Sequence, residues 1–438
     1  MRWLALLLLV ACAPSPAALH RSVDRELARR LGGEVTIGDR THVAELLAKP
    51  LDSDAAVRIA FANSARLEAA LAELGIAGGA VASARSLGPL DVDVTYRRGD
   101  GEHELELTAV QDVLGLVASA RRAGAHAELA AARARATAVA LRLAARVEIA
   151  FHDLVAAQQE LELRQTAFDA ADAAATVRER MFAAGNTTVL AQARERAARE
   201  QARVDVARAE ATVEVRREAV DALLGLTGAE TRWTADAARL PDPPAAAPAL
   251  DGLEAAAVAA SVDVAGARAS ADAAANHVAD ARLRTLLPRL GLGVSYDARG
   301  DARELGPALR LGLPLLDWNS GDRARAHAEA RRTERELAAV AIELRAGARA
   351  ARIAALAAYQ EARHVKEVIL PLRQQILDET LAHYNAMDAD PFALVSARRE
   401  LVEAGHQYVD ALRRYANAMT RVHALERGVA LDTSDDAL

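Results

Sequence analysis

Residues 90–97 read Leu-Asp-Val-Asp-Val-Thr-Tyr-Arg, so that apolar and polar side chains alternate without a break. Alternation with a period of two predicts a strand that has one apolar and one polar face. The sequence Arg-Gly-Asp-Gly at 98–101 is typical of a turn, and residues 104–109 alternate again. We therefore expect a β-hairpin whose strands lie at about 89–97 and 104–110.

Helical patterns flank this hairpin on both sides. A helix is predicted over about 54–86, and Gly88-Pro89 ends it. The stretch at about 112–184 contains no proline and predicts a helix more than about 100 Å long, at about 1.5 Å per residue. Gly185, Asn186 and Thr187 then predict a tight turn, and a return helix is expected over about 188–224.

The same order of patterns recurs about 200 residues further along, which indicates a duplicated half rather than a short repeat. Strands are predicted at about 289–297 and 308–316, and helices at about 252–287, 321–387 and 391–427. Leu401, Leu412 and Tyr415 lie on an apolar seam of the last helix. We therefore expect repeats at 51–225 and 253–428, a proline-rich linker at 226–252 and a disordered tail at 429–438.

The strands of both hairpins have two different faces. In the second hairpin we expect one face to contact lipid, and its residues are Leu290, Leu292, Val294, Tyr296, Leu309, Leu311, Leu313 and Leu315. In the first hairpin the polar face is interpreted as the wall of a water-filled lumen, with Asp91, Asp93, Glu104 and Glu106. The alternative for these four carboxylates is the solvated edge of a soluble sheet.

Strands of roughly nine residues are long enough to cross a membrane. Four strands are too few to close a barrel, and an open sheet in lipid would leave backbone groups at its edges unpaired. Closure would therefore require several copies of the chain, and three copies would supply about 12 strands. No long apolar run follows the first 12 residues, so we expect no transmembrane helix.

The first 14 residues have the layout of a lipoprotein export signal. One arginine precedes an apolar run, and Cys12, the single cysteine of the chain, follows small residues. We expect a signal peptide at 1–11, acylation of Cys12, and a lipidated tether at 12–50. The residue after the cysteine is Ala13 rather than aspartate, which favours the outer membrane. The alternative is a secretory signal with an incidental cysteine.

Composition excludes several classes of function. The net charge is −7, with 54 basic and 61 acidic residues interspersed, so no nucleic-acid partner is expected. Aromatic residues make up only 3% of a chain rich in alanine, leucine, arginine and glutamate, a composition typical of long helices. No nucleophile–base motif and no helical pair of histidines is present. We therefore expect no enzyme activity, no metal site and no cofactor.

Asp388 and Asp390 lie at the predicted second tip, before Pro391. Around a three-fold axis they would bring six carboxylates together, where they could control the passage of cations. They could equally cap the helix that begins at Pro391.

Three segments carry a resemblance to the TolC-like outer-membrane efflux family, in its lipoprotein branch. They are 182–190 (FAAGNTTVL), 306–321 (GPALRLGLPLLDWNSG), and 384–387 (YNAM) with 392–398 (FALVSAR). The resemblance covers almost all of the mature chain. It implies a homotrimer whose 12-strand transmembrane barrel in the outer membrane continues into a long periplasmic α-helical barrel. It also implies docking onto a periplasmic adaptor (membrane fusion) protein and an inner-membrane pump, with no catalysis.

The chain departs from the family pattern at two places. The second tip has no glycine where the first has Gly185, and the strand before Asp112 lacks the glycine-rich exit that 318–321 provides in the second half. The segment 384–387 is similar to a subgroup often linked to export of copper or other heavy metals.

The fold expected is mainly α with a small β part, built from a duplicated helix–hairpin–long helix–helix unit. The leading hypothesis is a passive exit duct of a tripartite efflux or type I secretion system. Its tip residues Gly185, Asn186, Thr187, Asp388 and Asp390 would form the gate and contact the adaptor. The alternative is a lipid-anchored periplasmic coiled-coil scaffold or adaptor without a pore, although the glycine-rich β-domain of adaptors is missing.

Overall fold

The structure, a computed structural model, describes residues 15–33, 35–86, 90–99, 102–113, 119–236, 239–286, 289–299, 301–312 and 320–431. The predicted signal peptide, Cys12, Leu313 and Leu315 lie outside the described residues. The chain forms two compact units, one made of 1–33, 66–139 and 261–343, the other of 34–65, 140–260 and 344–438.

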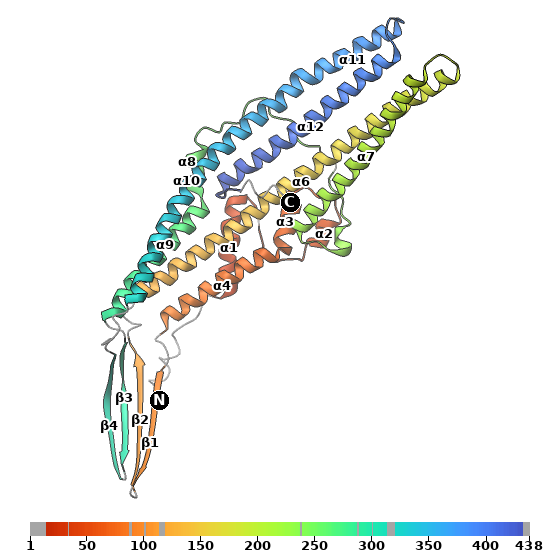
Figure 1. Ribbon diagram of the computed structural model, residues 1–438. Helices are drawn as coiled ribbons and strands as arrows, with labels where there is room; N and C mark the ends of the chain where they lie inside the picture. The colour runs from red at the N-terminus through yellow and green to blue at the C-terminus, as the bar shows by residue number, and fades with distance from the viewer. Residues whose placement is uncertain are drawn as a thin grey trace. The chain divides into compact units, whose positions relative to one another are not determined.

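The first unit contains a four-stranded antiparallel sheet in the order β1-β2-β3-β4 (Figure 1). Its strands are β1 (Leu90–Gly99), β2 (Glu102–Asp112), β3 (Arg289–Arg299) and β4 (Ala302–Gly312). The two predicted hairpins are confirmed. The predicted start of the last strand at 308 is wrong, because Arg299 pairs with Ala302 across a short turn. Arg303 and Glu304, which lie before the predicted start, belong to the first residues of the strand.

Helices α4 (Ala65–Arg85) and α9 (Val262–Leu286) precede the hairpins, and α6 (Ser119–Ala183) and α10 (Ser320–His364) follow them. The single helix predicted over 54–86 is divided into α3 (Ser53–Asn63) and α4, because Ser64 has an extended backbone with ψ 106°. The single helix predicted over 252–287 is likewise divided into α8 (Leu253–Ala260) and α9. Here the Ser261 hydroxyl accepts a hydrogen bond from the backbone N–H of Val264 at 3.1 Å and caps α9.

A π-helical turn at Val365–Ile369 separates α10 from α11 (Leu370–Asn385), where one helix was predicted over 321–387. Pro371 follows this turn and has no N–H to donate to the preceding helical turn, which explains the local change of hydrogen bonding. The last helix, α12 (Pro391–Arg427), has the predicted bounds.

The segment at 12–50 was expected to be a tether with a short helix. It contains α1 (Pro16–Leu31) and α2 (Val43–Leu47), and α1 buries Leu19, Val23 and Leu27. These three residues recur every four positions, so they form one apolar stripe of an amphipathic helix. The expected tail begins with another buried residue, Val429.

Helix α4 is, within the described part of the chain, the one helix long and apolar enough to cross a membrane, where the sequence predicted none. This is weak support for a span, because a core helix of a soluble protein has the same composition. Val81 and Ala84 of α4 are buried with Ala125 of α6, so packing between helices accounts for part of its apolar character.

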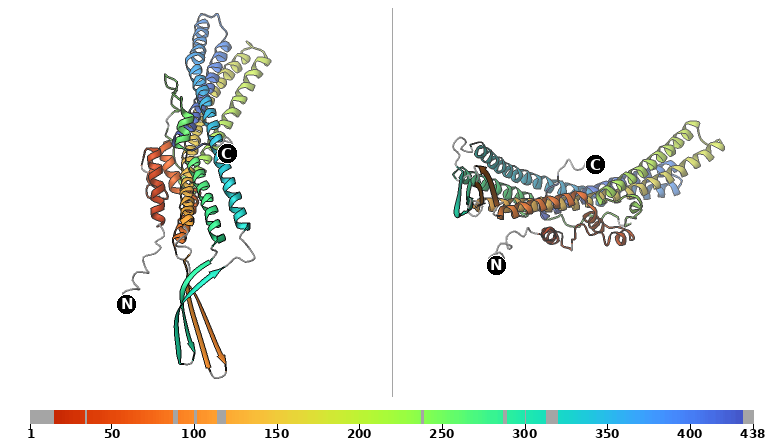
Figure 2. Two further views of the ribbon diagram at one scale, coloured as in Figure 1. Left: turned by 90° about the vertical axis from the view of Figure 1, so that its left-hand side faces the viewer. Right: turned by 90° about the horizontal axis from the view of Figure 1, so that it is seen from below.

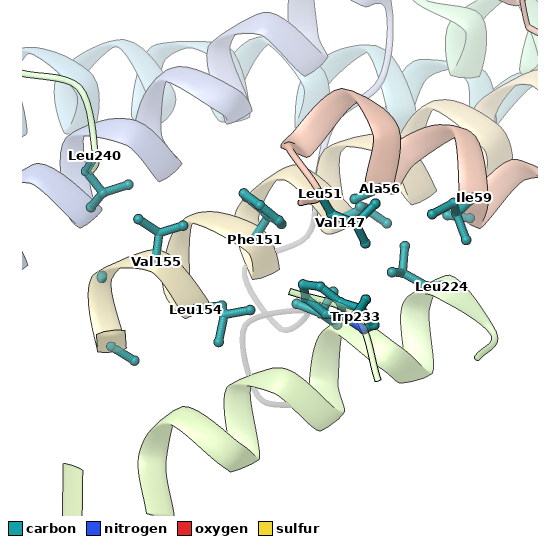
Figure 3. Packing of buried hydrophobic residues seen from close by; sticks show 14 of the residues in the cluster. Leu51, Ala56, Ile59, Val147, Phe151, Leu154, Val155, Leu224, Trp233 and Leu240 are labelled. Carbon is teal, nitrogen blue, oxygen red and sulfur yellow. The ribbon is translucent and has the colours of Figure 1, made fainter. Parts of the chain in front are cut away.

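The second unit has its core where α3, α6, α7 (Val189–Leu224) and α12 meet the segment after η2 (Gly228–Thr231). Figure 3 shows Trp233 between α6 and α7, beside Leu224 and Val147. The Trp233 indole N–H donates to Asp221 Oδ1 at 2.6 Å. The seam predicted for α12 is buried at Leu412 and partly exposed at Leu401 and Tyr415.

Candidate functional site

The register of the sheet divides its side chains between two faces, because directly paired residues of antiparallel strands point to the same side. Val94 pairs with Leu107, Leu107 with Tyr296, and Tyr296 with Leu305. Most apolar residues of the four strands therefore lie on one face, and buried Val110 of β2 is an exception. The residues on this face are Leu90, Val92, Val94, Tyr96, Leu105, Leu107, Ala109, Leu290, Leu292, Val294, Tyr296, Leu305, Pro307, Leu309 and Leu311.

This apolar face is exposed in the single chain. Val94 is 61% exposed, Leu309 68% and Leu305 75%. Soluble proteins rarely leave so large and continuous an apolar surface in water, so the face requires a lipid or protein partner. The six predicted lipid-facing residues within the described ranges lie on this face together. The residues of β1 and β2 were not named from the sequence, although the alternation at 90–97 and 104–109 already indicated them. Leu305 was not named either.

The opposite face is polar and carries all four predicted lumen carboxylates. It is not purely acidic, because three arginines that were not named from the sequence pair with them. Arg97 on β1 lies 3.8 Å from Glu104. Arg310 on β4 donates to Asp91 at 3.0 Å and to Asp93, and Arg299 on β3 lies 2.7 Å from Glu104. The pairs made by Arg310 and Arg299 join residues about 200 positions apart, which the alternation of a single strand does not show.

The two helical tips have the same turn geometry but different residues. At the first tip the backbone N–H of Gly185 donates to Phe182 O at 2.9 Å, with a φ of 76° at Gly185. At the second tip the N–H of Met387 donates to Tyr384 O at 3.0 Å, with a φ of 61°. Met387 therefore adopts the left-handed conformation that glycine occupies at the first tip, and its side chain is 95% exposed.

The two tips are held together within the second unit. The Arg178 guanidinium lies 3.1 Å from the centre of the Phe392 ring and donates to Thr187 Oγ1 at 3.1 Å. Asp390 accepts a hydrogen bond from the N–H of Phe392 at 3.2 Å and so caps α12. Helix capping is one of the two roles that the sequence suggested for this residue. Asp388 lies 3.0 Å from His383 Nδ1. Asn186, the remaining predicted tip residue, donates its N–H to Met181 O.

His406 on α12 and Asp221 on α7 are buried ionisable groups of the second unit. Burial lowers the pKa of His406, and the nearby Arg164 guanidinium lowers it further. Burial also raises the pKa of Asp221, although the hydrogen bond from Trp233 opposes this effect. Among the described residues, no group of three or more His, Cys, Asp or Glu side chains could hold a metal ion.

No protein-family model matches the chain, and no curated protein sequence matches it. Solved structures do match it over most of their length. The outer membrane protein VceC from Vibrio cholerae is 18% identical, with a TM-score of 0.66 over 95% of this chain and 99% of that one. The Campylobacter jejuni CmeC outer membrane channel is 16% identical, with a TM-score of 0.66 over 98% and 91%.

A membrane protein from Pseudomonas aeruginosa is 17% identical, with a TM-score of 0.70 over 89% of this chain and 94% of that one. At these identities the similarity concerns the fold, over 89% or more of this chain in each case. The chain therefore has the fold of the TolC-like outer-membrane channel proteins.

Proposed function

We propose that the chain is the outer-membrane channel of a tripartite efflux or type I secretion system. The observation that carries the proposal is the four-stranded sheet with a continuous exposed apolar face, an opposite charged face and two outer strands without a neighbour in the sheet order. Lipid would cover the first face and water the second. The similar structures support the same arrangement, since one is described as an outer membrane channel.

The open edges specify how the barrel would close. Strands alternate in direction from β1 to β4, so β4 of one copy can pair antiparallel with β1 of the next. Three copies would give a closed ring of about 12 antiparallel strands, an even number in the range of outer-membrane barrels. Closure would satisfy the edge N–H and C=O groups, which lipid cannot do.

The helices would extend the duct into the periplasm as an α-helical barrel. The tip residues Gly185, Asn186, Thr187, Asp388 and Asp390 would lie at its narrow end, where a periplasmic adaptor binds and an inner-membrane pump delivers the substrate. Heavy-metal ions such as copper, or drugs, are the substrate classes we propose. Acylation at Cys12 would add a lipid anchor to the outer membrane.

Purification of the mature protein from detergent-solubilised outer membranes would test this proposal. We expect trimers that lose their compact form on a gel only after heating, and that conduct ions in planar lipid bilayers. A monomer released from membranes by salt or by a lipase, without conductance, would contradict the channel. That result would support the alternative of a lipid-anchored scaffold or adaptor.

A further inference from the structure

One arginine joins the two outer strands of the sheet across its polar face. Arg310 Nη1 on β4 lies 3.0 Å from Asp91 Oδ2 on β1, and Arg310 also donates to Asp93 on β1. In a flat sheet, β1 and β4 would be three strand spacings apart, about 14 Å. The contact therefore requires a sheet that curves with its polar face inside. Figure 2 (left) shows the β3–β4 hairpin turned across the β1–β2 hairpin.

Two glycines of β3 allow this curvature. A Cβ at Gly293 would lie 1.9 Å from the backbone oxygen of Ala109, and a Cβ at Gly291 would lie 2.5 Å from Val110 Cγ1. Any side chain at these positions would push β3 away from β2. Arg310, whose register partner is Gly291, thus projects over a part of the polar face that is free of other β3 side chains.

The group Asp91–Arg310–Asp93 is accessible to water. The side chains of Asp91 and Asp93 are 59% and 62% exposed, and that of Arg310 is 39% exposed. Such exposed ion pairs contribute little to stability, but their charges act on ions in the adjacent solvent. The group lies at the end of the sheet next to the helices, since Asp91 is the second residue of β1 and Arg310 is two residues from the end of β4.

We propose that Arg310 sets the ion selectivity of the lumen at this end of the barrel by offsetting the charges of Asp91 and Asp93. The inference rests on the proposed channel. Asp112 lies on the same face, in the register row of Gly291 and Arg310, and its charge is the same in every variant below. The group Asp91–Arg310–Asp93 by itself would give a trimer six carboxylates and three guanidinium groups, a net charge of about −3. Removal of Arg310 would double that charge to about −6, and removal of both carboxylates would reverse it to about +3.

The test is the permeability ratio of K⁺ to Cl⁻, from the reversal potential of purified channels in planar bilayers under a KCl gradient. At about 0.1 M salt the Debye length is about 10 Å, so lumen charges act on passing ions. We expect Arg310→Gln to raise the ratio about twofold or more, and Asp91→Asn/Asp93→Asn to lower it. Arg310→Lys keeps the charge and should keep the ratio. All differences should shrink at about 1 M salt, where the Debye length is about 3 Å.

Arg98→Gln is the matched control, because it removes the same charge from the opposite face of the sheet. It should leave the ratio unchanged. An unchanged ratio in Arg310→Gln channels, or an equal shift in Arg98→Gln channels, would overturn the role of Arg310. If Arg310→Gln fails to assemble, the Asp91→Asn/Asp93→Asn variant provides the test. A lower permeability ratio of K⁺ to Cl⁻ in that variant supports the inference, and an unchanged ratio overturns it. A wild-type protein without any conductance would contradict the proposed function itself.

Discussion

Exchange of Val94 for arginine tests whether the apolar face of the sheet contacts lipid. Val94 lies in the middle of β1, pairs with Leu107 and is 61% exposed, so its side chain meets whatever surrounds the sheet. An arginine facing lipid near the bilayer midplane costs about 2–4 kcal/mol. For three copies the cost is about 6–12 kcal/mol per trimer. At about 1.4 kcal/mol per factor of ten, the cost in one copy lowers the equilibrium constant for insertion by about 30- to 700-fold.

Thr95→Arg is the control, because Thr95 is the next residue, lies on the polar face and pairs with Glu106. This exchange should leave the stability of the sheet almost unchanged, or raise it by up to about 1 kcal/mol through attraction between the arginine and Glu106. The assay is the urea midpoint of protein inserted in lipid vesicles, together with the amount of heat-modifiable trimer in outer membranes. Equal midpoints and equal trimer yields for the two variants would refute the lipid-facing assignment, since a surface exchange in water changes stability by only about 0.5 kcal/mol.

Three further predictions concern packing and buried groups. In a urea titration, Gly293→Ala should destabilise the sheet by about 1–3 kcal/mol, because its Cβ would meet the backbone oxygen of Ala109 at 1.9 Å. Gly306→Ala is the control, since its Cβ would lie 3.6 Å from Ser295 Oγ, and it should have no such effect. The pKa of His406 is lowered in the folded protein, so the unfolded state binds the proton first and stability should fall as pH drops below about 6.5. His406→Leu should reduce the difference in melting temperature between pH 7.5 and about 5.5, and an unchanged difference would contradict this role. Trp233→Phe should cost about 1–3 kcal/mol by removing the N–H that donates to buried Asp221, and Trp233→Phe/Asp221→Leu should recover part of the loss in thermal unfolding.

The faces of the strands were predictable because side-chain direction in a strand depends only on position along the chain. The six described apolar residues of the second hairpin and the four carboxylates of the first lie on opposite faces of the sheet for this reason. The breaks at Ser64 and Ser261 were not predicted, since a single residue leaving helical geometry does not disturb the apolar periodicity around it. Pro371 was a visible signal of the π-helical turn, and sequence reasoning did not use it.

The turn at Met387 illustrates a limit of local propensity. Methionine disfavours a positive φ, so the sequence gives no sign that the second tip copies the Gly185 turn. The capped start of α12 at Asp390 and the end of α11 leave the chain only a few residues in which to reverse. The antiparallel helices therefore impose the left-handed conformation on whichever residue occupies that position.

The amino-acid sequence by itself determined the duplicated order of helices and hairpins and the two-faced strands, because each follows from the spacing of side chains along a local backbone. Only the tertiary structure decided that β2 lies beside β3, that the sheet curves around its polar face, and that Arg310 meets carboxylates 217 and 219 positions away. These features depend on where separate segments meet in space, and the periodicity of one segment contains no information about the position of another.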